Sequence, residues 1–249
     1  MFKSLEIKIL LSIIAVALLL SSCGDETKSL DTDSFGYEYY PIEAGKFWIY
    51  KMDETLIKLE GNGNTTSTYF LREDVTESFV NTVGDTIFKI QRSISDTQDG
   101  AYATTDIWTA EATREGIYRV EENLEFVKMI FPFKVGTSWE GNLFDNLTEV
   151  NVAETNVWVY KDWGNYEVAS KGIPFAVEGE NYPTVTKIDQ ANFETSIERR
   201  YAVEYYAEGV GLIQKEMEIY DTQCPCPGQS WIQKAEAGFK LKQTLVDHN

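Results

Sequence analysis

Residues 40–48 read YPIEAGKFW, and residues 131–139, which lie 91 positions further along the chain, read FPFKVGTSW. Both stretches have an aromatic residue, Pro and an apolar residue, then Gly and, three positions later, Trp. Pro restricts the backbone, Gly permits a tight bend, and Trp anchors the following strand in a core. We therefore expect two similar β-segments with Trp48 and Trp139 buried. The alternative is that these Trp side chains stack on a ligand.

Two further echoes keep the same order along the chain. Residues 86–90 (TIFKI) match 184–188 (TVTKI) at an offset of 98, and residues 116–121 (GIYRVE) match 211–216 (GLIQKE) at an offset of 95. Collinear matches of this kind predict two copies of a module of about 90 residues. The alternative is a recurring composition of strands and turns.

The local pattern within both copies is that of strands. Segments rich in Ile, Val, Thr, Tyr, Phe and Trp alternate with turn residues, at 46–51, 55–60, 68–75, 86–94, 106–110 and 117–121, and at 149–160, 166–170, 184–190, 199–206 and 212–220. The prediction is an all-β fold of antiparallel sheets in two similar modules, curled into a barrel or paired as a sandwich. The first module spans 39–130, and the second spans 131–249 with a C-terminal extension.

The N-terminus has the features of an export signal. Lys3 and Lys8 precede twelve largely aliphatic residues, 9–20, which are too few to cross a bilayer. The following Leu-Ser-Ser-Cys resembles the lipobox of bacterial lipoprotein precursors. The resemblance implies a cleaved signal peptide at 1–22 and acyl chains, palmitate among them, on Cys23. The alternative is an ordinary signal peptide with an incidental cysteine.

The segment after Cys23 is polar and is expected to be a flexible tether over 23–38. Asp25 and Glu26 resemble the acidic signal that sends Bacteroidota lipoproteins to the cell surface. We therefore expect an outer-membrane lipoprotein, with surface exposure favoured over the periplasmic face. Loss of residues 1–22 changes the formal net charge from −18 to −19. Such a chain repels phosphates, which excludes nucleic acid as a partner.

The two openings and the segment 205–212, YYAEGVGL, resemble a group of exported β-proteins and lipoproteins of Bacteroidota. The resemblance covers roughly residues 40–220. The openings depart from the commoner Pro-Leu form because Ile42 and Phe133 follow the prolines. The resemblance implies an exported all-β protein and carries no enzymatic activity or site residues.

Few residues offer chemistry. His248, next to the C-terminus, is the only histidine. A single terminal histidine excludes a Ser-His-Asp triad and a multi-histidine metal site. We expect His248 to lie in a disordered tail. We predict no metal and no cofactor. Cys224 and Cys226 are expected to form a disulfide that staples a loop in an oxidising compartment. The alternatives are unpaired thiols and redox or metal chemistry.

The leading functional hypothesis is a non-catalytic binding or accessory subunit of an envelope complex. In it, some of the 33 aromatic side chains on one sheet face contact an envelope protein or a glycan. The first alternative is a carrier of an apolar ligand in a half-open β-barrel. The second is a carboxylate-based glycoside hydrolase, whose acidic pair the sequence cannot select because it is defined by distance in space. An exposed flat patch would favour the binding subunit, and an enclosed apolar cavity would favour the carrier. Two facing carboxylates in a cleft would favour the hydrolase.

Overall fold

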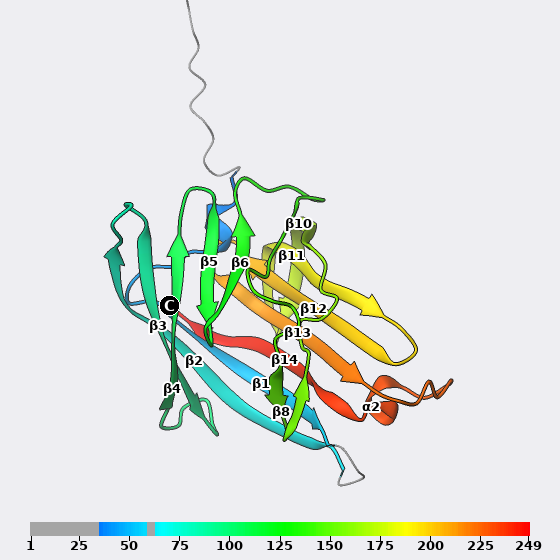
Figure 1. The fold of residues 1–249 in the computed structure, drawn as a ribbon. Helices are drawn as coiled ribbons and strands as arrows, with labels where there is room; N and C mark the ends of the chain where they lie inside the picture. Colours follow the sequence, from blue (N-terminus) through cyan, green and yellow to red (C-terminus); the bar gives the residue numbers. More distant parts are fainter. Residues whose placement is uncertain (1–34, 59–62) are drawn as a thin grey trace, which may run out of the picture. The chain divides into compact units, whose positions relative to one another are not determined.

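The computed structural model describes residues 35–58 and 63–249, which form a 12-stranded antiparallel sheet and a separate two-stranded hairpin (Figure 1). The elements are η2 Tyr37–Tyr39, β1 Phe47–Ile57, β2 Thr65–Val80, β3 Thr86–Ser95, β4 Ala103–Ala112, β5 Gly116–Glu121, β6 Leu124–Ile130, β7 Ser138–Trp139, β8 Val150–Val152, β9 Thr155–Val157, β10 Tyr166–Val177, β11 Glu180–Glu194, β12 Glu198–Ala207, β13 Gly211–Asp221, α2 Trp231–Lys234 and β14 Ala237–His248. Neither helix in these ranges is long and apolar enough to cross a bilayer.

The large sheet consists of two six-stranded meanders placed end to end. Its strand order is β6-β5-β4-β3-β2-β1-β14-β13-β12-β11-β10-β7, so β1 to β6 follow one another, as do β7 and β10 to β14. The C-terminal strand joins the meanders, because β14 pairs with β1 from Trp48↔His248 to Ile57↔Gly238. In each meander, strands adjacent in the sheet are therefore also consecutive in the chain, apart from the β8–β9 hairpin.

The two ends of the sheet approach each other and nearly close it into a barrel. Phe126 on β6 forms an isolated antiparallel bridge with Asn142, which lies just beyond β7. The backbone amide of Val127 donates to the carbonyl oxygen of Gly141 at 2.8 Å. The indole N–H of Trp139 donates to the Val127 carbonyl oxygen at 2.8 Å. These bonds satisfy polar groups at the two edge strands, which would otherwise stay unpaired.

The two openings make the same backbone hydrogen bonds around their glycines. The amide of Gly45 donates to Val75 at 2.8 Å, and the amide of Gly136 donates to Val168 at 2.9 Å. Both glycines have a positive φ, 93° and 81°, which glycine adopts at little cost. In both openings the valine amide bonds back to the residue after the glycine, at 2.9 and 3.0 Å. The tryptophan three positions beyond each glycine is buried, at 8% and 7% exposure.

The two meanders differ in what fills the space beneath them. Residues 140–165 separate β7 from β10, and the β8–β9 hairpin in this connection lies in front of β14 in Figure 1. Side chains of this connection belong to the main core, among them Val157, Val159 and Trp163. In the first meander only residues 58–64 separate β1 from β2. No comparable connection in the described residues covers that meander.

The fold class predicted from the sequence, all-β with antiparallel sheets, is confirmed, and the sheet curls into a barrel. Several expected boundaries are wrong. β1 is continuous where two strands were expected, and residues 149–160 contain the β8–β9 hairpin instead of one strand. The sequence prediction also missed β6 and β14. His248 belongs to β14 and pairs with Trp48, so the expectation of a disordered tail is wrong.

Candidate ligand-binding site

A cavity of about 220 Å³ lies inside the barrel, among residues of the first meander and of β12 to β14. Aromatic and apolar side chains form much of its wall: Trp48, Tyr50, Met52, Tyr69, Trp108 and Leu241. A second hollow of about 420 Å³ shares Trp108 and Leu241 with it and reaches the β8–β9 hairpin. The second hollow falls within the range of about 300–1,000 Å³ that is typical of small-molecule sites, and the first lies somewhat below it.

Strand alternation places charged groups among these apolar ones. In the register of β1, β2 and β3, Trp48 is opposite Glu73, and Glu73 is opposite Arg92. Successive residues of a strand point to opposite faces, so Leu71 and Val75 share the interior face with Glu73. All three are buried, with Glu73 4% exposed. Glu73 therefore occupies a core position and needs partners within the barrel.

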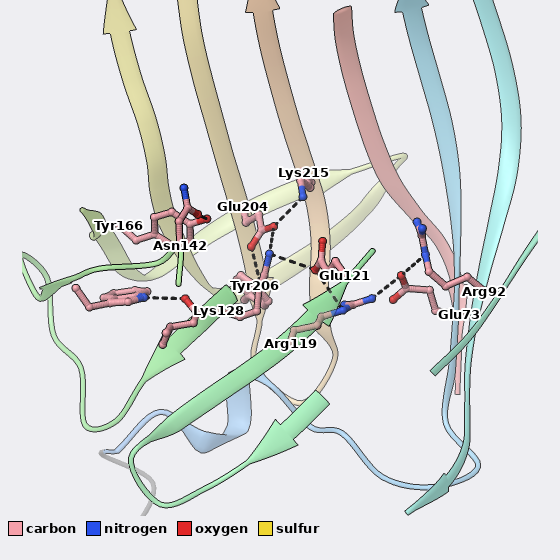
Figure 2. Close-up of polar contacts among 12 residues, drawn as sticks. Glu73, Arg92, Arg119, Glu121, Lys128, Asn142, Tyr166, Glu204, Tyr206 and Lys215 are labelled. Atoms are coloured by element: carbon pink, nitrogen blue, oxygen red, sulfur yellow. Dashed lines mark hydrogen bonds and ion pairs between the residues drawn. The ribbon is translucent and has the colours of Figure 1, made fainter. Parts of the chain in front are cut away.

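These partners begin a chain of alternating charges, which Figure 2 shows crossing the barrel interior. The Arg92 Nε lies 3.0 Å from Glu73 Oε1, and an Nη of Arg119 lies 2.6 Å from the same oxygen. The Nε of Arg119 is in turn 3.3 Å from Glu121. Glu73 thus receives two guanidinium groups from different strands, β3 and β5.

The chain continues towards the second meander. Lys128 Nζ lies 3.8 Å from Glu121 and 2.7 Å from Glu204. Glu204 is 0% exposed and accepts a hydrogen bond of 2.6 Å from the Tyr206 hydroxyl. Lys215 Nζ is 3.3 Å from Glu204 Oε1. All seven charged residues line the same cavity, and the sequence of charges begins and ends with a cation.

The chain of alternating charges holds its carboxylates in the ionised form. Burial by itself would raise the pKa of Glu204, but Lys128, Lys215 and the Tyr206 hydroxyl outweigh it and lower this pKa to about 2. Burial would likewise raise the pKa of Glu73, yet its two arginine partners lower it. Buried charges persist only where such partners offset the loss of hydration.

Trp108 forms the junction between the charged and apolar walls. The Arg92 guanidinium lies 3.5 Å from the centroid of its ring, and that of Arg119 lies 5.0 Å away. Stacking of this kind is a favourable cation–π contact. The indole N–H of Trp108 is buried and has no acceptor among the described residues.

The residues singled out from the sequence occupy different places. Cys23 lies outside the described residues. Cys224 and Cys226 form a disulfide in the loop between β13 and α2, away from the cavity lining. Trp48 lines the cavity and donates its indole N–H to a backbone carbonyl at 2.7 Å, whereas Trp139 lies in the main core. No group of three described His, Cys, Asp or Glu residues is placed to hold a metal ion.

The amino-acid sequence did not reveal the charged chain. Its members are spread over β2, β3, β5, β6, β12 and β13. Each could be read as a charge on a solvated strand face, which is the commoner case. A usable signal was present in alternation: Glu73 shares its face with Leu71 and Val75. This alternation indicates that Glu73 lies on the same face as the two apolar residues, but it does not indicate which cations pair with Glu73.

No family model matches this chain, and no curated protein matches it in sequence. Among solved structures it is similar to a protein of Bacteroides fragilis described as exported and YmcC-like in fold, with a TM-score of 0.44 and 10% identity over 84% of this chain and 98% of that one. It is also similar to a protein of Parabacteroides distasonis described as a lipoprotein, with a TM-score of 0.39 and 11% identity over 85% and 98% of the two chains. Likeness of this degree carries no conclusion about ligand or activity.

Proposed function

We propose that this chain is a non-catalytic binding protein of the cell envelope that holds a small ligand inside its barrel. The observation that carries the proposal is the interior cavity, whose lining combines aromatic side chains with a chain of buried charges. Ligand sites typically combine apolar walls with a few placed polar groups. A wholly apolar ligand, as in the carrier hypothesis, would leave the charges facing hydrocarbon, which is costly.

The carboxylates of the charged chain support a non-catalytic role. The pKa values of Glu73, Glu121 and Glu204 are all lowered because nearby cations outweigh the effect of burial. None of the three is a proton donor near neutral pH, whereas a glycoside hydrolase needs one protonated carboxyl. Burial raises the pKa of Glu54, in the second hollow. If the protein has a glycosidase activity that Glu54→Gln abolishes, the binding proposal is wrong and the protein is a hydrolase.

The cavity itself is tested by filling it. Met52 lines the cavity and is 4% exposed, so Met52→Trp places a larger side chain where the ligand would lie. The native protein, purified from its own membrane, is examined by native mass spectrometry for a retained small molecule. The wild type should carry one, and Met52→Trp should lose it while its thermal unfolding midpoint stays within a few degrees. Equal small-molecule content in both proteins would overturn the proposal.

Attachment to the outer membrane through lipid on Cys23 is part of the same proposal. It rests on the lipobox, and the acidic pair Asp25 and Glu26 supports the cell surface as the compartment. Several acyl chains on one residue anchor a protein stably. Cys23→Ser should move the protein from the detergent phase to the aqueous phase. Proteinase treatment of intact cells should degrade the domain, and full protection would place it on the periplasmic side.

We also infer that the chain is a duplicated module with its copies at 39–130 and 131–249. The matched hydrogen bonds of Gly45 and Gly136, and the two six-stranded meanders that follow them, support this reading. Matched variants test it. Trp48→Phe and Trp139→Phe should destabilise the fold by similar amounts in urea, and a difference of several kcal/mol would contradict equivalent roles.

An envelope partner is the second candidate function, and one surface feature favours it. At the end of the β2–β3 hairpin, Phe79, Val80 and Val83 are 54%, 65% and 79% exposed. Neighbouring exposed apolar side chains of this kind mark contact surfaces. The triple Ser variant should lose a protein that cross-links to the wild type on cells. Unchanged cross-linking would exclude this hairpin as the contact.

A further inference from the structure

The charge sequence of the interior indicates which ligands the cavity accepts, provided that the cavity is a binding site as proposed above. Four bases and three carboxylates alternate across it: Arg92, Glu73, Arg119, Glu121, Lys128, Glu204 and Lys215. Each carboxylate lies between two cations. The two terminal cations, by contrast, each form one ion pair with a carboxylate in the described part of the chain.

Each terminal cation has donors left over. Arg92 bonds Glu73 through Nε alone at 3.0 Å, and no described carboxylate pairs with its two Nη atoms. Arginine offers five N–H donors in a fixed planar fork that suits oxyanions. Lys215 carries three N–H donors and lies at 3.3 Å from Glu204, which already accepts bonds from Lys128 and from the Tyr206 hydroxyl.

Two further donors in the same cavity lack acceptors. The Trp108 Nε1 and the Arg119 Nε are both buried without a hydrogen-bond acceptor in the described residues, although the latter lies 3.3 Å from Glu121. Buried donors left unpaired cost free energy, and a ligand oxygen would satisfy them. Surplus cations and unpaired donors select the same partner, which is an acceptor with negative charge.

The apolar part of the lining selects the rest of the molecule. Tyr50, Met52 and Tyr69 face the cavity from β1 and β2, and Leu241 faces it from β14. Aromatic and thioether side chains of this kind pack against rings and short apolar chains. Glu122 also lines the cavity, but it is exposed at the β5–β6 turn, where solvent screens its charge.

We infer that the cavity binds an organic acid. The surplus positive charge of Arg92 and Lys215, at the two ends of the charged chain, attracts its carboxylate, sulfonate or phosphate group, and its ring or short apolar body lies on Tyr50, Met52 and Tyr69. The ligand is an acid even though the chain as a whole has a formal net charge of −18. The fold thus encloses surplus positive charge in a strongly negative protein. Wall charges of this kind strengthen binding of an opposite charge in a partly desolvated site.

A matched pair of probes tests the inference. Anilinonaphthalene sulfonate and phenylnaphthylamine share the same ring body, and only the first has a negative charge. Fluorescence titration is done on the exported full chain carrying Cys23→Ser, so that no detergent or lipid takes up the probes. The sulfonate should bind about tenfold or more tightly than the neutral probe, and added salt should weaken only the sulfonate.

Variants locate the acid group. Lys215→Met and Arg92→Gln should each weaken sulfonate binding about fivefold or more and weaken neutral-probe binding much less. Glu204 keeps Lys128, and Glu73 keeps Arg119, so no carboxylate is stranded. The control is Lys240→Met, because Lys240 also pairs with a carboxylate, at 3.1 Å, but is 53% exposed and does not line the cavity.

The outcomes separate the two proposals. Equal affinity for both probes, or sulfonate binding that neither variant weakens, would overturn the acid inference and leave the binding cavity standing. Binding of neither probe, or binding that Met52→Trp does not reduce, would overturn the cavity proposal as well. Lys215→Arg keeps the charge and should restore sulfonate binding, which separates loss of charge from loss of fold.

Discussion

The titration of Glu204 makes the buried charge chain accessible to measurement. Its carboxylate is 0% exposed, and its pKa is lowered from 4.5 to about 2 in the folded protein. Because the folded pKa lies below the unfolded one, ionised Glu204 stabilises the fold. That contribution is complete above the unfolded pKa and is lost as the pH falls through the folded pKa. At 1.36 kcal/mol per pKa unit, the full contribution is about 3 kcal/mol.

The part accessible to experiment follows from the same two values. Between about pH 7 and about pH 3.5, the linkage relation gives a loss of about 1 kcal/mol from Glu204 alone, for pKa values of 4.5 and about 2. The variant Glu204→Gln cannot titrate at this position. Its free energy of unfolding should therefore fall less over this range, by about 1 kcal/mol. At neutral pH it should be less stable than the wild type by about 3–5 kcal/mol, because Lys128 and Lys215 lose a buried partner.

Urea unfolding, followed by the fluorescence of the six tryptophans, measures both effects. Titrations at several pH values give the slope of the free energy of unfolding for the wild type and for Glu204→Gln. Glu125→Gln is the matched control, because Glu125 is exposed, and it should follow the wild type. If Glu204→Gln loses as much stability as the wild type on acidification, Glu204 is not held ionised by the chain and the electrostatic account of the cavity is wrong.

Three further predictions concern the fold. Gly238→Ala should destabilise the protein by more than about 3 kcal/mol in urea, because the added methyl overlaps the carbonyl oxygen of Ile219. In the control Gly45→Ala the added methyl meets no atom, and the cost should be about 1 kcal/mol. Similar losses in the two variants would contradict the β13–β14 geometry. Trp139→Phe should cost about 1–3 kcal/mol by removing the bond that helps to close the barrel, and an unchanged urea midpoint would show that the closure adds nothing. Reducing the loop disulfide should lower stability by less than about 2 kcal/mol, because the loop it closes is short; calorimetry showing a larger loss would mean that this loop supports the barrel.

Local patterns carried much of the fold. The alternation and turn residues predicted most strands of both meanders, and the repeated opening marked Gly45 and Gly136, which make matching hydrogen bonds. These features depend on a few neighbouring residues, so a sequence reveals them. β14 escaped prediction because its residues 237–248, AGFKLKQTLVDH, mix lysines with apolar residues. This strand joins the meanders only because it pairs with β1, nearly 200 residues away. The hydrogen bond between Phe47 and Asn249, for example, links residues 202 positions apart.

The candidate site lies at the opposite extreme. Arg119 and Glu73 are 46 residues apart in the chain, and Lys128 and Glu204 are 76 apart, yet each pair is in direct contact. By itself the sequence determined the strand-rich class and the two similar openings, because these follow from short-range backbone preferences and side-chain alternation. Only the tertiary structure decided which face of each strand is enclosed, and that residues 140–165 fill part of the barrel interior while a charged cavity remains between the first meander and β12 to β14. Alternation specifies two faces for every strand, and closure of the sheet alone determines which of them is removed from water.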